Sequence, residues 1–188
     1  MKTILGIDIG LSGAVAYLDA DEGELLAVFD MPVYYTQGTA KTKTGKLRNK
    51  GHIDLDKLLY MLEIPKVHFE DTLVIMEDVH TFPGQGIVSM GTLLEQKGII
   101  LGMCKALEYD VQLISPKTWQ KHFYLNCPKE IKGKDARKKW MKTHSRLYAI
   151  ARFPTEWATK FMDVDAHGRS DACLIAQYAY DTQEIAPA

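Results

Sequence analysis

Short apolar runs separated by turn residues open the chain. Residues 4–9, 14–18 and 25–29 are apolar enough to be buried strands, whereas 10–13 and 19–23 are rich in Gly, Ser and Asp. Connections this short join antiparallel neighbours, because parallel strands need a crossover of a dozen or more residues. The pattern therefore predicts a three-stranded antiparallel meander.

The remainder of the chain alternates between strand and helix patterns. Continuous apolar runs indicate two further strands, at 73–79 and 111–114. Helical spacing of apolar residues predicts five helices, at 53–64, 87–107, 117–123, 134–153 and about 168–180. This order predicts an α/β domain with a mixed five-stranded sheet, in which three antiparallel strands precede two parallel strands and helices flank the sheet.

Two segments need a separate prediction. Residues 33–53 are polar and basic and have neither period, so they are predicted to form a long surface loop, which in a compact domain is usually functional or disordered. The helix at 134–153 is predicted to turn an apolar face that includes Trp140, Leu147 and Ile150 toward the core.

Length and composition indicate one domain, residues 1–188, that can bury a core without disulfides. Cys104, Cys127 and Cys173 are odd in number and far apart, so neither a disulfide framework nor a zinc ribbon is expected. The start of the chain lacks a signal-peptide pattern, which predicts a cytoplasmic protein of a bacterium or a phage-infected host cell. No stretch is expected to span a bilayer, and no membrane partner is expected.

The formal net charge is −1, but the charges are unevenly distributed. Lys and Arg gather in two blocks. The first consists of Lys41, Lys43, Lys46, Arg48 and Lys50, followed by His52. The second consists of Lys129, Lys132, Lys134, Arg137, Lys138, Lys139, Lys142 and Arg146. Two basic blocks in a neutral chain suit a polyanion such as DNA, with contacts expected from the first block and from Lys138 and Lys139.

Carboxylates lie inside apolar runs that are otherwise typical of buried strands. Asp8 lies within the first run, and Glu77 closes the run at 73–76. Carboxylates are not left unpaired in a core, because burying an isolated charge is costly. A third acid, Asp171, opens the last helical pattern. If the three converge, they form a hard oxygen site suited to Mg²⁺ or Mn²⁺.

The order of these motifs resembles the RNase H-like superfamily, and specifically phage-type RuvC-like Holliday junction resolvases. The three acidic positions of that family resemble Gly6-Ile7-Asp8-Ile9-Gly10, Val74-Ile75-Met76-Glu77 and Asp171-Ala172. The family's loop and interface helix resemble Pro83-Gly84-Gln85-Gly86, Ser89-Met90 and Gly98-Ile99-Ile100-Leu101-Gly102. Its basic strand-to-helix segment resembles Ser115-Pro116-Lys117-Thr118-Trp119-Gln120-Lys121. The resemblance spans nearly the whole chain.

The resemblance implies a crossover junction endodeoxyribonuclease that hydrolyses phosphodiesters with two Mg²⁺ or Mn²⁺ ions per site. Such an enzyme cuts a four-way DNA junction symmetrically and is therefore expected to be a homodimer. The helix at 87–107 is the expected interface, since Gly91, Gly98 and Gly102 allow close approach. An ordinary core helix is an equally good interpretation of that apolar stripe.

The metal ligands implied by the resemblance are Asp8, Glu77 and Asp171. Bacterial members generally place a fourth acid or a His three residues before the last acid, where this chain has Gly168. The first choice for a fourth ligand, and for proton transfer, is His167; Asp165 is the second choice, and Asp163 is a further one. The resemblance also implies that Lys121, or alternatively Lys117, holds the scissile or a neighbouring phosphate.

Each motif alone also fits an ordinary structural role. Asp8 could bond the turn that follows it, Glu77 could pair with a cation such as Lys117, and Asp171 could be an ordinary acid near a helix start. Lys117, Lys121 and both basic blocks could be solvated surface charges. The coincidence of three acids in the expected order is what favours a site.

Three competing functions follow from the same residues. Gly6 to Gly10, followed by Ser12-Gly13, also resembles the phosphate loop of sugar kinases and actin-like ATPases, although the chain has no second copy of it. A non-catalytic junction-binding protein would keep the fold without the chemistry. A nuclease for flaps, forks or RNA–DNA hybrids would keep the chemistry and change the substrate, since fold does not fix function.

Overall fold

Five strands form the central sheet of the computed structural model, which describes residues 2–41, 44–69, 71–80, 86–153, 161 and 167–182. They are β1 (Lys2–Asp8), β2 (Ala14–Asp19), β3 (Leu25–Asp30), β6 (Asp71–Glu77) and β7 (Asp110–Ile114), in the spatial order β3-β2-β1-β6-β7. The first three pair in antiparallel fashion, and β6 runs parallel to β1 and to β7. The predicted mixed sheet is confirmed.

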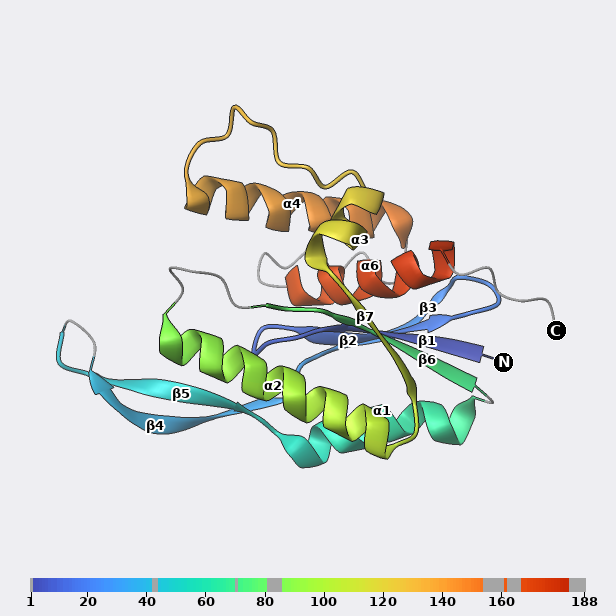
Figure 1. Cartoon of the computed structure of the whole chain (residues 1–188), viewed down its shortest axis with the longest axis horizontal. Coiled ribbons are helices and arrows are strands. Elements are labelled where there is room, and N and C mark those ends of the chain that lie inside the picture. Colours follow the sequence, from blue (N-terminus) through green and yellow to red (C-terminus); the bar gives the residue numbers. More distant parts are fainter. Residues whose placement is uncertain are drawn as a thin grey trace.

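Helices cover both faces of this sheet (Figure 1). One face carries α1 (Leu55–His68) and α2 (Ile87–Ala106), and the other carries α6 (His167–Thr182). A further layer outside α6 is formed by α3 (Pro116–His122) and α4 (Lys134–Arg152). Each helix lies where the spacing of apolar residues predicted it.

The last helix lies so close to β1 that one strand residue has no room for a side chain. A Cβ atom on Gly6 would lie 2.2 Å from the carbonyl oxygen of Ala172 and 2.6 Å from the backbone nitrogen of Ala176. Both distances are far below van der Waals contact, so only glycine fits. The backbone of α6 therefore rests directly on the first strand.

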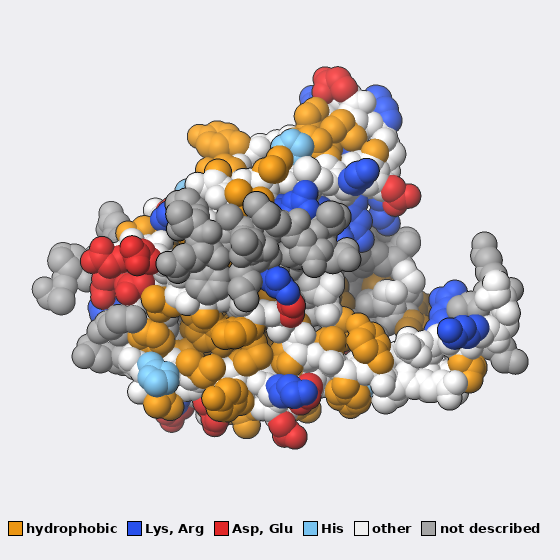
Figure 2. Space-filling view, turned by 180° about the vertical axis from the view of Figure 1, so that it is seen from behind, with side chains coloured by type: hydrophobic (Ala, Val, Ile, Leu, Met, Phe, Trp, Pro, Cys, Tyr) orange, Lys and Arg blue, Asp and Glu red, His pale blue; other side chains and the backbone are white. Residues whose placement is uncertain are grey.

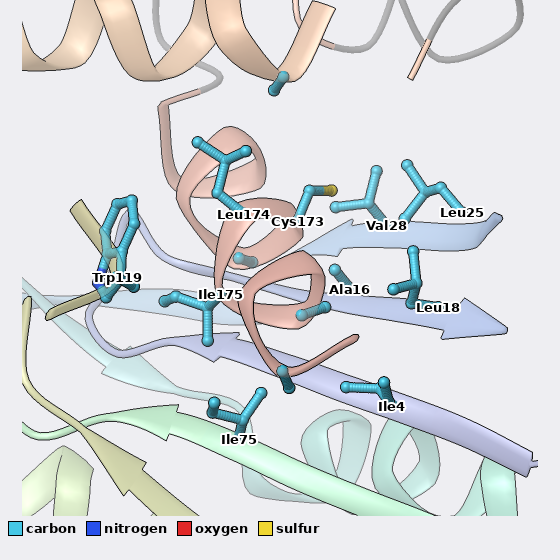
Figure 3. Packing of buried hydrophobic residues seen from close by; sticks show 14 of the residues in the cluster. Ile4, Ala16, Leu18, Leu25, Val28, Ile75, Trp119, Cys173, Leu174 and Ile175 are labelled. Carbon is cyan, nitrogen blue, oxygen red and sulfur yellow. The ribbon is translucent and has the colours of Figure 1, made fainter. Parts of the chain in front are cut away.

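Alternate residues of β1 face two separate cores. Ile4 belongs to the cluster beneath α6, and Figure 3 shows it on β1 among the residues of that cluster. Leu5 and Ile7 belong to the cluster beneath α1 and α2. A strand buried on both faces has a nearly continuous apolar sequence, as seen here. The same alternation turns Asp8, at the end of β1, toward α6.

The prediction of a long loop at 33–53 is wrong, because this segment forms a two-stranded ribbon. β4 (Val33–Lys41) pairs antiparallel with β5 (Leu47–Ile53), separately from the central sheet, and the ribbon projects from the body (Figure 1). Gly45 in its turn has φ +83°, a conformation that favours glycine. Most of the ribbon is exposed on both faces, so the apolar alternation that marks a half-buried strand is absent.

The apolar face predicted for α4 is correct at Ile150, which packs against the core, and wrong at Trp140 and Leu147. Leu147 is 51% exposed, Trp140 is only partly buried, and the buried residues are Ser145 and Ala149. The inner face of α4 is therefore more polar than the core face of an ordinary amphipathic helix. The reason lies in the group that Ser145 contacts, described below.

The expectation that no stretch is long enough to span a bilayer does not hold for α2 by length and composition. This 20-residue helix has a mean hydropathy of 1.2 over its most apolar window, long and apolar enough to cross a membrane by length and composition. Its buried residues are Gln96, Ile100 and Cys104, and Ile87 at its start is 83% exposed. An apolar helix with so little of its surface covered by its own chain calls for another explanation, which is proposed below.

The contact between Gly6 and α6 gives a testable prediction for stability. Gly6→Ala is expected to lower the free energy of unfolding by about 1–3 kcal/mol, because the added methyl group overpacks the interface. Val67→Ala on α1 is the control, because Val67 is 76% exposed, and its free energy of unfolding is expected to change by less than about 0.5 kcal/mol. Urea denaturation measures both; equal stability of the two variants would contradict the proposed close contact.

Candidate active site

Two carboxylates lie side by side at the ends of adjacent parallel strands. The register pairs Ile7 of β1 with Met76 of β6, so Asp8 and Glu77 each follow the last pair. Both side chains face α6, because Ile4 and Ile75 of the same strands pack beneath that helix. As whole residues, Asp8 and Glu77 are both partly buried.

The start of α6 is fixed over these strand ends by two contacts. A Cβ atom on Gly168 would lie 2.0 Å from the carbonyl oxygen of Ser12, so the helix start rests on the turn after β1. The guanidinium of Arg169 binds the carboxylate of Asp30 at the end of β3, with Nε donating to Oδ1 at 2.6 Å. Together these contacts turn Asp171 toward the end of β1.

Charge repulsion shows that the three acids share one site. Burial raises the pKa of Asp8 well above its usual value, and the neighbouring carboxylates of Asp171 and Glu77 raise it further. Burial, with a further contribution from Glu77, raises the pKa of Asp171 to about 7. Burial also raises the pKa of Glu77. The sequence prediction that these acids converge is consistent with this mutual repulsion.

Two hydrogen-bond donors orient the carboxylates of Glu77 and Asp171. Trp119 Nε1 donates to Glu77 Oε1 at 3.0 Å, and Ser145 Oγ donates to Asp171 Oδ1. Trp119 reaches Glu77 because α3 begins directly after β7, which pairs with β6 beside that residue. Ser145 lies on the inner face of α4, where its hydroxyl reaches Asp171, and this contact explains the polar character of that face.

The cation at the site is Lys142 of α4. Its positive charge lowers the pKa of both Asp8 and Asp171, opposing the effect of burial. Its Nζ lies 2.9 Å from Nε2 of His167; since an ammonium can only donate, that ring nitrogen accepts. Neither Lys142, which was named only as part of the second basic block, nor Ser145 was predicted to lie at the site. Their spacing of three on one helix was a usable signal, but Trp140 and Leu147 suggested a different inner face.

Asp78, which lies next to the site, forms an ordinary structural ion pair and so differs from the three carboxylates. Asp78, which directly follows Glu77, is paired with Lys97 of α2 and lies 3.0 Å from Nε2 of His80. The hydrogen bond from Lys97 lowers the pKa of Asp78. Asp78 is therefore neutralised by the protein itself, whereas three carboxylates at the site share Lys142.

The donor set fits a hard divalent cation, because all three groups are carboxylates. Within the described ranges, no three His, Cys, Asp or Glu side chains are grouped so that they could hold a metal ion. One oxygen of Glu77 and one of Asp171 are engaged by Trp119 and Ser145. Asp163 and Asp165 lie outside the described residues, and Nε2 of His167 is engaged by Lys142, so the fourth ligand stays a prediction.

The predicted phosphate-binding lysines lie in different places. Lys117 and Lys121 of α3 line a hollow with Tyr178 and Thr182, at the opposite end of α6 from Asp171. No contact in the described part of the chain joins them to the carboxylates, so their role stays a prediction.

The other predicted DNA-binding residues lie on α4 and on the ribbon. Lys138 and Lys139 border one hollow on α4 together with Lys142. Lys46, Arg48 and Lys50 lie on or beside β5. Lys43 and the side chain of Lys41 lie outside the described residues.

Comparison with known proteins supports the fold. No protein-family model and no curated protein matches the chain. The structure of Thermus thermophilus RuvC in complex with a Holliday junction substrate is similar, with a TM-score of 0.53 and 14% sequence identity over 96% of this chain and 94% of that chain. This similarity confirms the predicted RNase H-like fold.

Two further solved structures show weaker similarity. A second Thermus thermophilus RuvC structure has a TM-score of 0.43 and 15% identity, covering 95% of this chain and 93% of that chain. The yeast mitochondrial Holliday junction resolvase Ydc2 has a TM-score of 0.41 and 15% identity, covering 95% of this chain and 80% of that chain.

The raised carboxyl pKa values predict how stability depends on pH in metal-free protein. Between pH 3.8, the ordinary pKa of an aspartic acid, and about 7, folded Asp171 keeps a proton that the unfolded chain has lost. The contribution of Asp171 to stability is therefore expected to fall across this range, by up to about 1.4 kcal/mol per pH unit, and to level off above it. Denaturation in EDTA at pH 5 and pH 8 measures the difference.

Asp171→Asn removes one titrating group and is expected to flatten this dependence. A variant as pH-dependent as the wild type would show that Asp171 titrates normally in the folded protein.

Proposed function

We propose that this chain is a divalent-metal-dependent endonuclease that resolves four-way DNA junctions by symmetric phosphodiester hydrolysis. The observation that carries the proposal is the convergence of Asp8, Glu77 and Asp171, from β1, β6 and α6, beside Lys142. The fold shared with RuvC, whose solved complex contains a Holliday junction substrate, supports the choice of substrate.

The residues divide the chemical work. Asp8, Glu77 and Asp171 would hold two Mg²⁺ or Mn²⁺ ions, with His167, Asp165 or Asp163 as the fourth ligand. Bound there, the ions would activate a water molecule and stabilise the leaving oxygen. Trp119 and Ser145 hold the carboxylates of Glu77 and Asp171 in place, which reduces the reorganisation needed to bind the ions. Lys142 supplies a positive charge beside the carboxylates, where it offsets the charge of the incoming phosphate.

Symmetric cutting requires two copies of the site, and α2 is the proposed dimer interface. Its exposed surface includes Ile87 and Leu94, which are 83% and 46% exposed. A Cβ atom added to Gly91 or Gly98 would have no other atom within 4 Å, so packing within the chain does not require glycine at either position. An exposed apolar helix with small residues suits close packing against the same helix of a second copy.

The chemistry is tested on a labelled four-way junction incubated with Mg²⁺, Mn²⁺ or EDTA, beside duplex and flap controls on a denaturing gel. Asp8→Asn, Glu77→Gln and Asp171→Asn are each expected to lower the cleavage rate by about 100-fold or more while junction binding in EDTA remains, because each removes a metal-binding charge. Asp110→Asn, an exposed acid at the start of β7, is the matched control and should cut normally.

The outcomes separate the competing functions. Paired symmetric nicks that need metal and occur only on the junction establish a resolvase. Equal cutting of flaps or hybrids keeps the nuclease and discards the junction assignment, and binding without cutting under every metal favours a non-catalytic junction-binding protein. Retained cleavage in Asp171→Asn would move the third ligand to Asp165 or Asp163.

The dimer is tested by Leu94→Arg. Two buried like charges at a two-fold interface are expected to weaken dimerisation by about 100-fold or more. Sedimentation velocity measures the change, with Val67→Arg as the control because Val67 is also an apolar, exposed residue and lies on α1. Dimers of unchanged affinity in Leu94→Arg would place the interface elsewhere.

A further inference from the structure

The β4–β5 ribbon begins beside the candidate active site. A Cβ atom on Gly51 of β5 would lie 2.6 Å from Cδ1 of Leu11, in the turn that starts just after Asp8. The base of the ribbon therefore packs on the turn next to the first carboxylate, and its far end projects away from the body (Figure 1).

Basic residues recur at every second position from Lys46, just before β5, into the strand. Lys46, Arg48 and Lys50 are followed by His52, and residues two apart in a strand share one face. The repeat is about 6.8 Å, twice the rise of about 3.4 Å per nucleotide in one strand of a DNA duplex. The ribbon thus presents a row of cations with a spacing suited to a sugar–phosphate backbone.

The ribbon carries an excess of positive charge. Residues 31–53 contain five Lys or Arg and no Asp or Glu, in a chain whose formal net charge is −1. Arg48 and Lys50 are exposed, and neither has a carboxylate partner within the described residues. Figure 2, which shows the molecule from behind, has Lys and Arg side chains on the projecting ribbon. Clustered charge of this kind attracts a polyanion.

Polar and aromatic groups continue the basic face toward the base of the ribbon. The ring of Tyr34 stacks on His52, with centroids 5.2 Å apart, and Thr36 Oγ1 lies 3.0 Å from His52 Nε2. The hollow at this base is also bordered by Asp54, Asp56 and Glu95. These acids repel phosphate, so the outer half of the ribbon, residues 46–50, is the part suited to nucleic acid.

We infer that the β4–β5 ribbon is a DNA-binding arm, whose row of Lys46, Arg48 and Lys50 holds the sugar–phosphate backbone of the duplex arm that leads into the site. The inference rests on the proposed function in taking DNA as the substrate. The arm supplies affinity and position, and the carboxylates supply the chemistry. Contacts of this kind do not depend on base sequence and weaken with salt.

The test compares K46Q/R48Q/K50Q with the wild type by fluorescence anisotropy on a labelled four-way junction, in EDTA and over a series of KCl concentrations. EDTA makes the measurement independent of cleavage, so the arm and the proposed function can fail separately. The affinity of the variant at moderate salt is expected to fall by at least about 10-fold. The slope of log K against log salt is expected to decrease in magnitude by about 2–3, since each phosphate contact contributes about 0.9.

The matched control is K2Q/K66Q/K105Q, which removes the same charge from the start of β1 and the last turns of α1 and α2, away from the ribbon. K46R/K50R keeps the charge and is expected to bind like the wild type. A loss of slope confined to the ribbon variant supports the arm, whether or not the junction is cut. An unchanged salt slope in the ribbon variant, or an equal loss of slope in the control variant, overturns the inference of a DNA-binding arm. It is also overturned if the ribbon variant loses binding to an acidic protein but keeps its binding to DNA.

Discussion

The contact between α6 and β1 is the constraint on which the site depends. Two glycines make it possible: Gly6 allows the helix backbone to rest on the strand, and Gly168 allows the helix start to rest on the turn at Ser12. A side chain at either position would push α6 away from the sheet, and with it Asp171 from Asp8. Because more than half of the residues of α6 are buried, such a shift would also open the core beneath it (Figure 3).

This geometry explains the one departure from the resolvase pattern. The chain has Gly168 where related sequences were expected to carry a fourth acid or a His, and no side chain fits there. The neighbouring polar positions are instead used by His167, which contacts Lys142, and by Arg169, which contacts Asp30. Close packing of the helix start thus removes one carboxylate from a site that already holds three, and the repulsion within the site is smaller as a result.

Most of the fold was predictable from the sequence, and the same apolar runs drew attention to the three acids, whereas the groups that contact these acids gave no such signal. Asp8 and Glu77 were recognisable because a charge inside a continuous apolar run needs a partner, and such runs mark strands buried on both faces. Ser145 and Lys142 gave no comparable signal, since polar residues are ordinary on a helix surface and only the tertiary contact shows which face is turned inward. The ribbon was missed because exposed strands lack the alternation of apolar and polar residues.

The position of the ribbon separates substrate binding from the chemistry of the carboxylates. In the sequence it lies between β3, an edge strand, and α1, and its outer part projects away from the contact between α6 and β1 (Figure 1). The carboxylates are buried close to one another, and their mutual repulsion costs stability when no metal ion is bound. Arg48 and Lys50 of the ribbon are exposed to solvent instead. Binding strength and chemistry are therefore held by parts of the molecule with different physical demands. Selection on substrate preference can act on the ribbon while the packing of α6 on β1 keeps the site unchanged.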